Sequence, residues 1–338
     1  MPTPQVFIVD ERTFPLHLQY QFAGTTAGQR EKHIGLLADI ARVRPGDPVI
    51  FYLTGYGFYG IFQIAQISHP FWERRDGYLQ KELGKPLIYR VLIEPLEVYR
   101  RPVTEWEAID KLPLYSRDIR WSLLYRKLKG ERGCSYLFPR EYKSLVQLLK
   151  LVNPEGPLAF YNEPNELNWE NGEIVIRNNK RKAYEGSRLS PFSHIDLTAG
   201  ETHLQAWFTW NIGKDSSLNE IVGSPEWFAN EVYAGSGMQK MDVLCIAAYG
   251  SVKEFRPIEL KAGKTESIMQ LRRYIWWIRD YVWEEGDKIQ PVWISKDYGD
   301  LNRIIKEAET IAKEERCEKP QLWSWKLVGN RPVFHRLD

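Results

Sequence analysis

A proline- and glycine-rich stretch at residues 153–157, with the sequence NPEGP, separates two parts of the chain that differ in hydrophobic periodicity. Before it, apolar runs such as 48–53 and 60–67 alternate in the manner of β-strands. After residue 199, strand-like runs are interleaved with runs whose apolar residues follow helical spacing. A chain of 338 residues is also too long for one ordinary hydrophobic core. The sequence therefore predicts two domains, residues 1–155 and 199–338, joined by residues 156–198.

The N-terminal part is predicted to form a compact, β-rich barrel with helices. Its strands are expected at residues 5–9, 48–53, 60–67 and 86–95, and its helices at 29–40 and 142–151. Farther along, Asn171-Gly172 between two strand-like runs is typical of a type I′ hairpin. Because residues 161–195 are polar, we interpret this hairpin as part of a connecting ribbon.

The C-terminal part is predicted to be a mixed α/β domain. Its strands are expected near residues 241–247, 255–260 and 290–294, and its helices near 201–210, 265–283 and 300–315. The last helix presents Ile304, Ala308 and Ile311 on one face, and Asp300 or Asn302 can cap its N-terminus.

Charge and composition alone name no partner. The 46 Lys and Arg residues nearly balance the 44 Asp and Glu residues, which excludes a polybasic coat, although residues 111–150 carry ten basic and three acidic side chains. Three distant cysteines and six scattered histidines argue against a disulfide framework or a zinc site. Because no apolar run approaches the ~20 residues that cross a bilayer, we expect a soluble, cytoplasmic protein with no membrane contact.

The segment Ile258-Glu259-Leu260-Lys261 combines charge with a strand-like pattern. In an extended strand Glu259 and Lys261 point to one face while their apolar neighbours enter the core on the other. A turn near residues 249–251 would bring the strand containing Asp242 beside them. Two carboxylates would then converge on a site suited to Mg²⁺, or to Mn²⁺, with Lys261 near the attacking water or the phosphate.

These residues resemble the PD-(D/E)xK nuclease superfamily, and Gln270-x-x-x-Tyr274 resembles the helical motif of its RecB-like and NucS-like branches. The resemblance implies a restriction-endonuclease-like α/β core in which Asp242 and Glu259 bind the metal, Lys261 activates water and Gln270 supports the site. It also implies an acidic residue from a preceding helix. We prefer Glu201 as this catalytic and metal-binding residue, with Glu220 as the rival.

The glycines of Gly55-x-Gly57-x-x-Gly60 fit a dinucleotide-binding pattern, but a strand-like run follows them where that pattern needs a helix. We therefore expect a hairpin there and no nucleotide cofactor. The run RPGDPVIFYLTG, followed by YGIFQIAQI and YRVLIEPL, resembles the EVE and PUA-like domains. That resemblance implies a small β-barrel that receives a modified or flipped base.

Aromatic stacking would hold such a base. The candidate aromatic side chains are Tyr56, Phe58, Trp72, Trp106 and Trp121, of which Trp72 and Trp121 are preferred. In the C-terminal part, Arg272 and Arg273 are candidates for contacts with the nucleic-acid backbone.

The leading hypothesis is a Mg²⁺-dependent DNA endonuclease whose N-terminal domain inspects DNA for a modified base, as in modification-dependent restriction. One alternative is a repair nuclease selective for mismatches or DNA structure. A second is a nucleic-acid-binding protein without catalysis. RNA remains open as the ligand, and the resemblance also suggests a homodimer.

Overall fold

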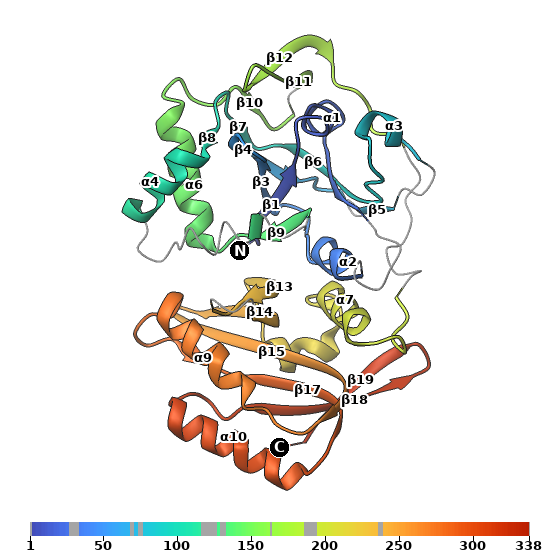
Figure 1. Cartoon of the computed structure of the whole chain (residues 1–338), viewed down its shortest axis with the longest axis vertical. Helices are drawn as coiled ribbons and strands as arrows, with labels where there is room; N and C mark the ends of the chain where they lie inside the picture. Colours follow the sequence, from blue (N-terminus) through green and yellow to red (C-terminus); the bar gives the residue numbers. More distant parts are fainter. Residues whose placement is uncertain are drawn as a thin grey trace. The chain divides into compact units, whose positions relative to one another are not determined.

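The computed structural model describes residues 2–26, 34–67, 71–73, 77–115, 127–128, 133–162, 164–185, 195–235 and 239–337. The chain forms two compact units, residues 2–193 and 194–338 (Figure 1). Within the described residues, no helix has the length and apolar character needed to cross a membrane.

The N-terminal unit is built on one curled sheet of mixed direction with the strand order β2-β6-β4-β3-β1-β9, to which β5 adds beside β6 and β8 beside β4. Its strands are β1 (Gln5–Val9), β2 (Phe22–Thr25), β3 (Pro48–Leu53), β4 (Gly57–Ile64), β5 (Phe71–Glu73), β6 (Tyr89–Pro95), β8 (Val103–Thr104) and β9 (Cys134–Tyr136). Strand β1 runs parallel to β3, and the other pairs are antiparallel. Over the described residues the sheet is a half-barrel, so the expected PUA-like barrel is not confirmed.

Helices and two short β-pairs complete this unit. They are α1 (Phe14–Tyr20), α2 (Ile34–Ala41), α3 (Gln80–Leu83), α4 (Glu105–Tyr115), α6 (Pro139–Val152), β7 (Glu97–Val98) with β10 (Ala159–Phe160), and β11 (Asn165–Glu170) with β12 (Glu173–Lys180). Helix α6 buries Leu145, Leu148 and Leu149 against Ile50 and Phe58, as the helical spacing predicts.

The glycine-rich segment after β3 forms a hairpin, as predicted, because β4 follows it directly and no helix intervenes. Gly57 has a φ of 149°, and a Cβ atom there would lie 2.1 Å from the carbonyl oxygen of Val103. Glycine is therefore required where β8 approaches β4.

The β11–β12 hairpin turns at Asn171 and Gly172, whose φ angles of 52° and 86° suit the predicted type I′ turn. It is not a free connecting ribbon, however. Leu167 and Ile174 are fully buried, and the hydroxyl of Tyr59 donates a 2.8 Å hydrogen bond to the carbonyl oxygen of Gly172. These contacts make the hairpin part of the N-terminal unit, which its polar composition did not reveal.

The C-terminal unit contains a mixed sheet with the strand order β13-β14-β15-β17-β18-β19 and with β16 beside β15. Its strands are β13 (Trp227–Tyr233), β14 (Lys240–Tyr249), β15 (Val252–Thr265), β16 (Lys288–Ile289), β17 (Val292–Tyr298), β18 (Gln321–Val328) and β19 (Arg331–Arg336). Strands β15, β17 and β18 are parallel, whereas the outer pairs are antiparallel. A mixed α/β unit was predicted.

The helices of this unit are α7 (Glu201–Asn211), α8 (Asn219–Val222), α9 (Gln270–Tyr281) and α10 (Leu301–Glu315), with a 3₁₀ turn at Ser216–Leu218. Helix α9 begins at Gln270 and not at residue 265, because β15 continues to Thr265. Asp300 caps α10, since its Oδ1 accepts a 3.1 Å hydrogen bond from the backbone N–H of Arg303.

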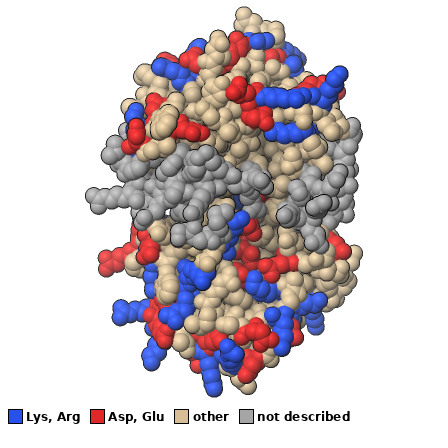
Figure 2. All heavy atoms as spheres, viewed as in Figure 1, with Lys and Arg blue, Asp and Glu red and all other residues tan. Residues whose placement is uncertain are grey.

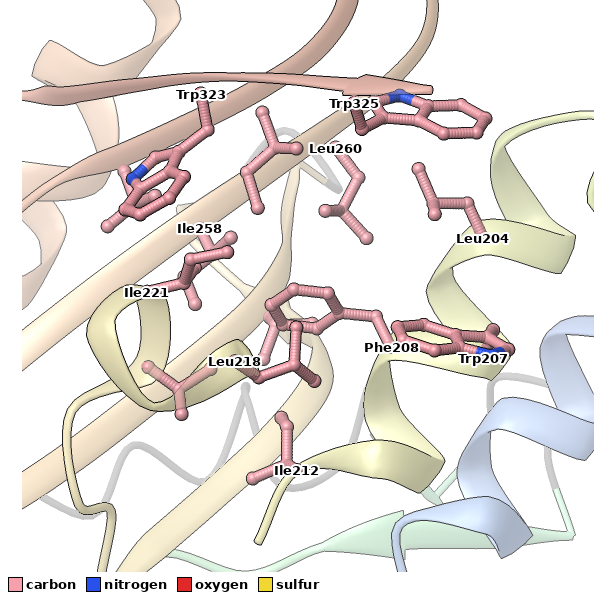
Figure 3. Packing of buried hydrophobic residues seen from close by; sticks show 14 of the residues in the cluster. Leu204, Trp207, Phe208, Ile212, Leu218, Ile221, Ile258, Leu260, Trp323 and Trp325 are labelled. Carbon is pink, nitrogen blue, oxygen red and sulfur yellow. The ribbon is translucent and has the colours of Figure 1, made fainter. Parts of the chain in front are cut away.

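Helix α7 packs on the sheet through a large apolar core (Figure 3). Leu204 and Phe208 on the helix face Ile258 and Leu260 on β15, and all four are fully buried. The alternation along β15 therefore places its apolar side chains against α7 and leaves the intervening charged residues for another role.

Candidate active site

The hairpin from β14 to β15 brings Asp242 on β14 beside Glu259 on β15. The ladder pairs Val243 with Ile258, so Asp242 lies next to Glu259 at the end of the pairing. Oδ2 of Asp242 accepts a 2.7 Å hydrogen bond from the backbone N–H of Leu260. The Asp242 carboxylate therefore accepts the hydrogen bond that a backbone carbonyl would otherwise accept from Leu260. This hydrogen bond fixes the carboxylate beside β15.

Glu259 and Lys261 share one face of β15, as their spacing predicts. Glu259 is only 3% exposed, and the Nζ atom of Lys261 donates a 2.7 Å hydrogen bond to its Oε1. The lysine side chain is 28% exposed, so its ammonium group reaches solvent while the carboxylate does not. A reactant arriving from solvent would thus meet Lys261 before Glu259.

Helix α7 contributes a third carboxylate. Oε1 of Glu201 lies 3.4 Å from the Nζ atom of Lys261. The rival candidate, Glu220, instead forms a 3.0 Å ion pair with Arg336 on β19. The structure therefore places Glu201, and not Glu220, beside the lysine.

Helix α9 holds Glu259 from the other side. Nε2 of Gln270 donates a 3.0 Å hydrogen bond to Oε1 of Glu259 and another to the hydroxyl of Tyr274. The Tyr274 hydroxyl lies 2.8 Å from Oε2 of Glu259 and 2.8 Å from the carbonyl oxygen of Lys240. Both oxygens of Glu259 are thus fixed in position, and Tyr274 is part of this network and not merely of the core.

The carboxylates outnumber the cations in this cluster. Burial, followed by repulsion from Glu259 and Glu201, raises the pKa of Asp242 well above its ordinary value. Burial also raises the pKa of Glu259, although Lys261 opposes the shift. For Lys261, burial would lower the pKa, but the combined attraction of Glu259, Asp242 and Glu201 outweighs burial and the pKa is raised. Such a cluster gains stability from a further positive charge.

The donor types fit a hard divalent cation with few protein ligands. Asp242 hydrogen-bonds through Oδ2 alone within the described residues, which leaves Oδ1 available. Mg²⁺ is commonly held by one or two carboxylates together with water and phosphate oxygens. However, no three His, Cys, Asp or Glu side chains of the described part are arranged as a complete metal site. Asp242 and Glu259 therefore fit a metal site with two carboxylate ligands. Glu201 lies beside the Nζ atom of Lys261.

The two arginines predicted to grip nucleic acid differ in their surroundings. Nε of Arg272 lies 2.6 Å from Oε1 of Glu315, and its guanidinium also pairs with Glu314 at 3.0 Å. Arg273 is exposed and forms no ion pair with the described residues. Of these two arginines, Arg273 is therefore the one available to an incoming phosphate.

The basic segment at residues 111–150 lies partly outside the described residues. Among its described members, Lys127 is buried and pairs with Glu141 at 2.8 Å, so it cannot meet a phosphate. On the face drawn in Figure 2, basic and acidic side chains are interspersed over the described surface. Charge alone therefore does not single out a binding surface there.

The predicted aromatic side chains do not form one cluster in the described part of the N-terminal unit. Phe58 is fully buried in the core, where its ring lies 5.2 Å from that of Tyr52. Tyr56 packs edge-on against Trp169, and Trp106 is 75% exposed on α4. The side chains of Trp72 and Trp121 lie outside the described residues. Phe58 is therefore a core residue and not a stacking surface. The sequence could not show this, because aromatic composition does not distinguish rings in the core from rings that stack on a base.

The same unit contains a pocket of about 290 Å³ that the sequence did not predict. Its lining is polar and aliphatic and consists of Ile8, Thr13, His17, Gly24, Thr25, Thr26, Lys85, Leu87, Leu128 and Gly133. Nδ1 of His17 lies 2.8 Å from the carbonyl oxygen of Phe22, which can only accept, so Nδ1 carries the hydrogen. Burial lowers the pKa of His17 to about 3, and Nε2 is therefore an unprotonated acceptor.

No family model matches the sequence, and no curated protein matches it. A hypothetical protein from Leishmania major is 12% identical, with a TM-score of 0.34, and the match covers 45% of this chain and 97% of that protein. Rpa0253 from Rhodopseudomonas palustris is 17% identical, with a TM-score of 0.27 and coverage of 44% and 94%. The restriction endonuclease FokI is 9% identical, with a TM-score of 0.28 and coverage of 73% and 55%. All three TM-scores are low, so these likenesses assign neither a fold nor a function to this chain.

Proposed function

We propose that the C-terminal unit is a metal-dependent nuclease that hydrolyses phosphodiester bonds in DNA. The observation that carries this proposal is the meeting of Asp242, Glu259 and Lys261. The Asp242 carboxylate lies against the backbone of β15, and Lys261 contacts Glu259 on the same strand. The raised pKa values of both acids add support, because a buried carboxylate cluster short of positive charge suits a cation.

Each residue of the cluster has a chemical role in this proposal. Asp242 and Glu259 would hold Mg²⁺ or Mn²⁺, which supplies charge neutralisation at the phosphate when bound. Lys261, whose side chain is 28% exposed against 3% for Glu259, would hold the scissile phosphate or the attacking water. Glu201 would help to keep Lys261 charged and oriented, since its carboxylate lies beside Nζ. Gln270 and Tyr274 would keep Glu259 in place.

We further infer that the N-terminal unit recognises DNA and that the whole chain acts in modification-dependent restriction. The pocket supports this inference. Its volume of about 290 Å³ lies near the lower end of ligand sites in proteins, about 300–1,000 Å³. Nε2 of His17 can accept a hydrogen bond from an N–H group of a flipped base, while Thr13 and Thr25 offer further polar contacts.

Cleavage of a panel of duplexes tests both statements. Plain, base-modified, mismatched and branched DNA would be incubated with Mg²⁺, with Mn²⁺ or with a chelator. We expect metal-dependent cleavage that is strongest on modified duplexes. The variants Asp242→Asn and Lys261→Met should bind DNA without cutting it, whereas Lys264→Met should cut normally. Lys264 is the matched control, because it lies on the same strand and its ion pair within the described part of the chain is with the exposed Glu266.

Other results would redirect the proposal. A preference for mismatched or branched DNA would assign a repair role in place of restriction. Binding without cleavage of any duplex under any metal would refute the nuclease and leave a nucleic-acid-binding protein. Cleavage by Asp242→Asn and Lys261→Met at the parental rate would show that the assigned site is wrong.

A further inference from the structure

Glu231 has an unusual backbone conformation next to the candidate site. It lies within β13, yet its φ angle is 53°, in the left-handed region that residues other than glycine rarely adopt. The ladder pairs Asn230 with Val243 and Val232 with Met241, so Glu231 stands directly opposite Asp242. Conformations of this kind persist only where the surroundings hold them, and they concentrate at functional sites.

The side chain of Glu231 contacts Gln205 and Lys240. Its Oε1 accepts a 3.1 Å hydrogen bond from Nε2 of Gln205, and its Oε2 accepts a 2.8 Å hydrogen bond from Nζ of Lys240. The same Nε2 of Gln205 donates a 3.0 Å hydrogen bond to the carbonyl oxygen of Asp242. Both amide hydrogens of Gln205 are thus used, one on Glu231 and one on the peptide of Asp242.

Gln205 also connects this contact to the rest of the site. It is 3% exposed and follows Glu201 by four residues on α7, so the two side chains lie on the same side of the helix, one turn apart. Glu201 reaches Lys261 while Gln205 reaches Asp242. The amide of Gln205 therefore fixes α7 relative to β14, and Glu231 fixes the orientation of that amide.

We propose that Glu231, acting through Gln205, is a positioning residue for Asp242 and Glu201. This inference rests on the proposed nuclease function. Glu231 would hold the Asp242 peptide in place, so that the carboxylate is presented to the metal at a constant distance. The left-handed backbone conformation of Glu231 directs its carboxylate to the amide of Gln205. With the usual dihedral angles of a strand, the side chain at this position would point elsewhere.

Substitution of Glu231 by glycine separates positioning from stability. Glycine adopts a positive φ readily, and this gain opposes the loss of the Lys240 ion pair and of the acceptor for Gln205, so Glu231→Gly should unfold at a temperature close to that of the parent. The lost contact to Gln205 should nevertheless lower kcat for DNA cleavage about 10- to 100-fold and raise the Mn²⁺ concentration that gives half-maximal rate, with an unchanged KM for DNA. Glu231→Gln keeps an acceptor for Gln205, and we expect it to retain most of the activity.

Arg316→Gly is the matched control. Arg316 also has a left-handed φ, 47°, but it ends α10 away from the carboxylate cluster. We expect this variant to cleave DNA like the parent.

The possible results discriminate clearly. Parental kcat and Mn²⁺ dependence in Glu231→Gly would overturn the positioning role while leaving the nuclease proposal intact. A loss of activity that follows a lower unfolding temperature in both Glu231 variants would also overturn it, because the effect would then be structural. If the parent chain itself cuts no duplex with Mg²⁺ or Mn²⁺, the proposed function and this inference both fall.

Discussion

Replacing Lys261 by methionine should make the stability of the C-terminal unit depend more steeply on pH. Methionine keeps most of the side-chain volume but removes the ammonium group that lies 2.7 Å from Oε1 of Glu259. Glu259 is 3% exposed, so in the variant its negative charge would be buried without a cation. The carboxyl group can avoid that situation only by taking up a proton.

The size of the effect follows from the burial of the two partners. Breaking a fully buried ion pair costs about 3–5 kcal/mol, and an exposed pair contributes about 0–1 kcal/mol. Because Glu259 is buried and Lys261 is 28% exposed, we expect a loss of about 2 kcal/mol at about pH 8. That loss corresponds to a factor of about 30 in the unfolding equilibrium.

The sign of the pH dependence follows from the direction of the pKa shift. Burial raises the pKa of Glu259 in the folded chain, and removal of Lys261, which lowers it, raises it further. A raised carboxyl pKa means that the folded state binds the proton more tightly than the unfolded state. Stability is then greatest below the unfolded pKa and falls as the pH rises through the folded pKa. The loss caused by Lys261→Met should therefore shrink at about pH 5.

Hydrogen–deuterium exchange provides the measurement, because it reports the opening of β15 separately from the N-terminal unit. Peptides from β15 of the parent and the variant would be compared at both pH values, after correction for intrinsic exchange. Lys264→Met, which removes a partner from an exposed pair on the same strand, should leave protection unchanged. Equal losses at the two pH values, or a larger loss at the lower one, would refute this account of Glu259.

Three further predictions concern single substitutions. Asp242→Asn should slow DNA cleavage by about 100-fold or more. It should also raise the unfolding temperature at neutral pH, because it removes repulsion with Glu259, and a lower unfolding temperature would contradict this electrostatic reasoning. Gly57→Ala should destabilise the N-terminal unit by more than about 2 kcal/mol in urea unfolding, because the new Cβ would collide with the carbonyl oxygen of Val103. An unchanged stability would mean that β8 can move away from β4 at no cost. Phe208→Ala should lower the free energy of unfolding of the C-terminal unit by about 3–5 kcal/mol, because the ring is fully buried beneath α7. The measurement is protection of β14 and β15 from hydrogen exchange, and a loss under about 1 kcal/mol would show that the core collapses around the gap.

Local patterns were sufficient to predict much of the fold and part of the site. Alternation along β15 predicts that Glu259 and Lys261 share a face, because strand geometry fixes the direction of every second side chain. The Asn171-Gly172 turn and the Asp300 cap were predictable for the same reason, since each depends on a few consecutive residues.

Features that depend on distant segments were not predictable in this way. The pocket around His17 and Lys85 is lined by residues from 8 to 133, and its existence depends on how several strands curl. Glu231 gave no sequence signal, because a left-handed conformation at a glutamate is imposed by its neighbours and not by its own preference. Phe58 was a candidate for stacking, yet tertiary packing places it in the core.

The pairing of β15 with β17 has a consequence for how this chain can change in length. From Ile258 to Lys261 the two strands run in step, and the register shifts only between Lys261 and Lys264. Inserting or deleting one residue before Lys261 would turn Glu259 and Lys261 toward the apolar core beneath α7 and turn Ile258 and Leu260 toward the polar side chains of Gln270 and Tyr274 on α9. Beyond Lys261 an irregularity already absorbs one extra residue, so natural or engineered variants can gain or lose residues there without inverting the strand.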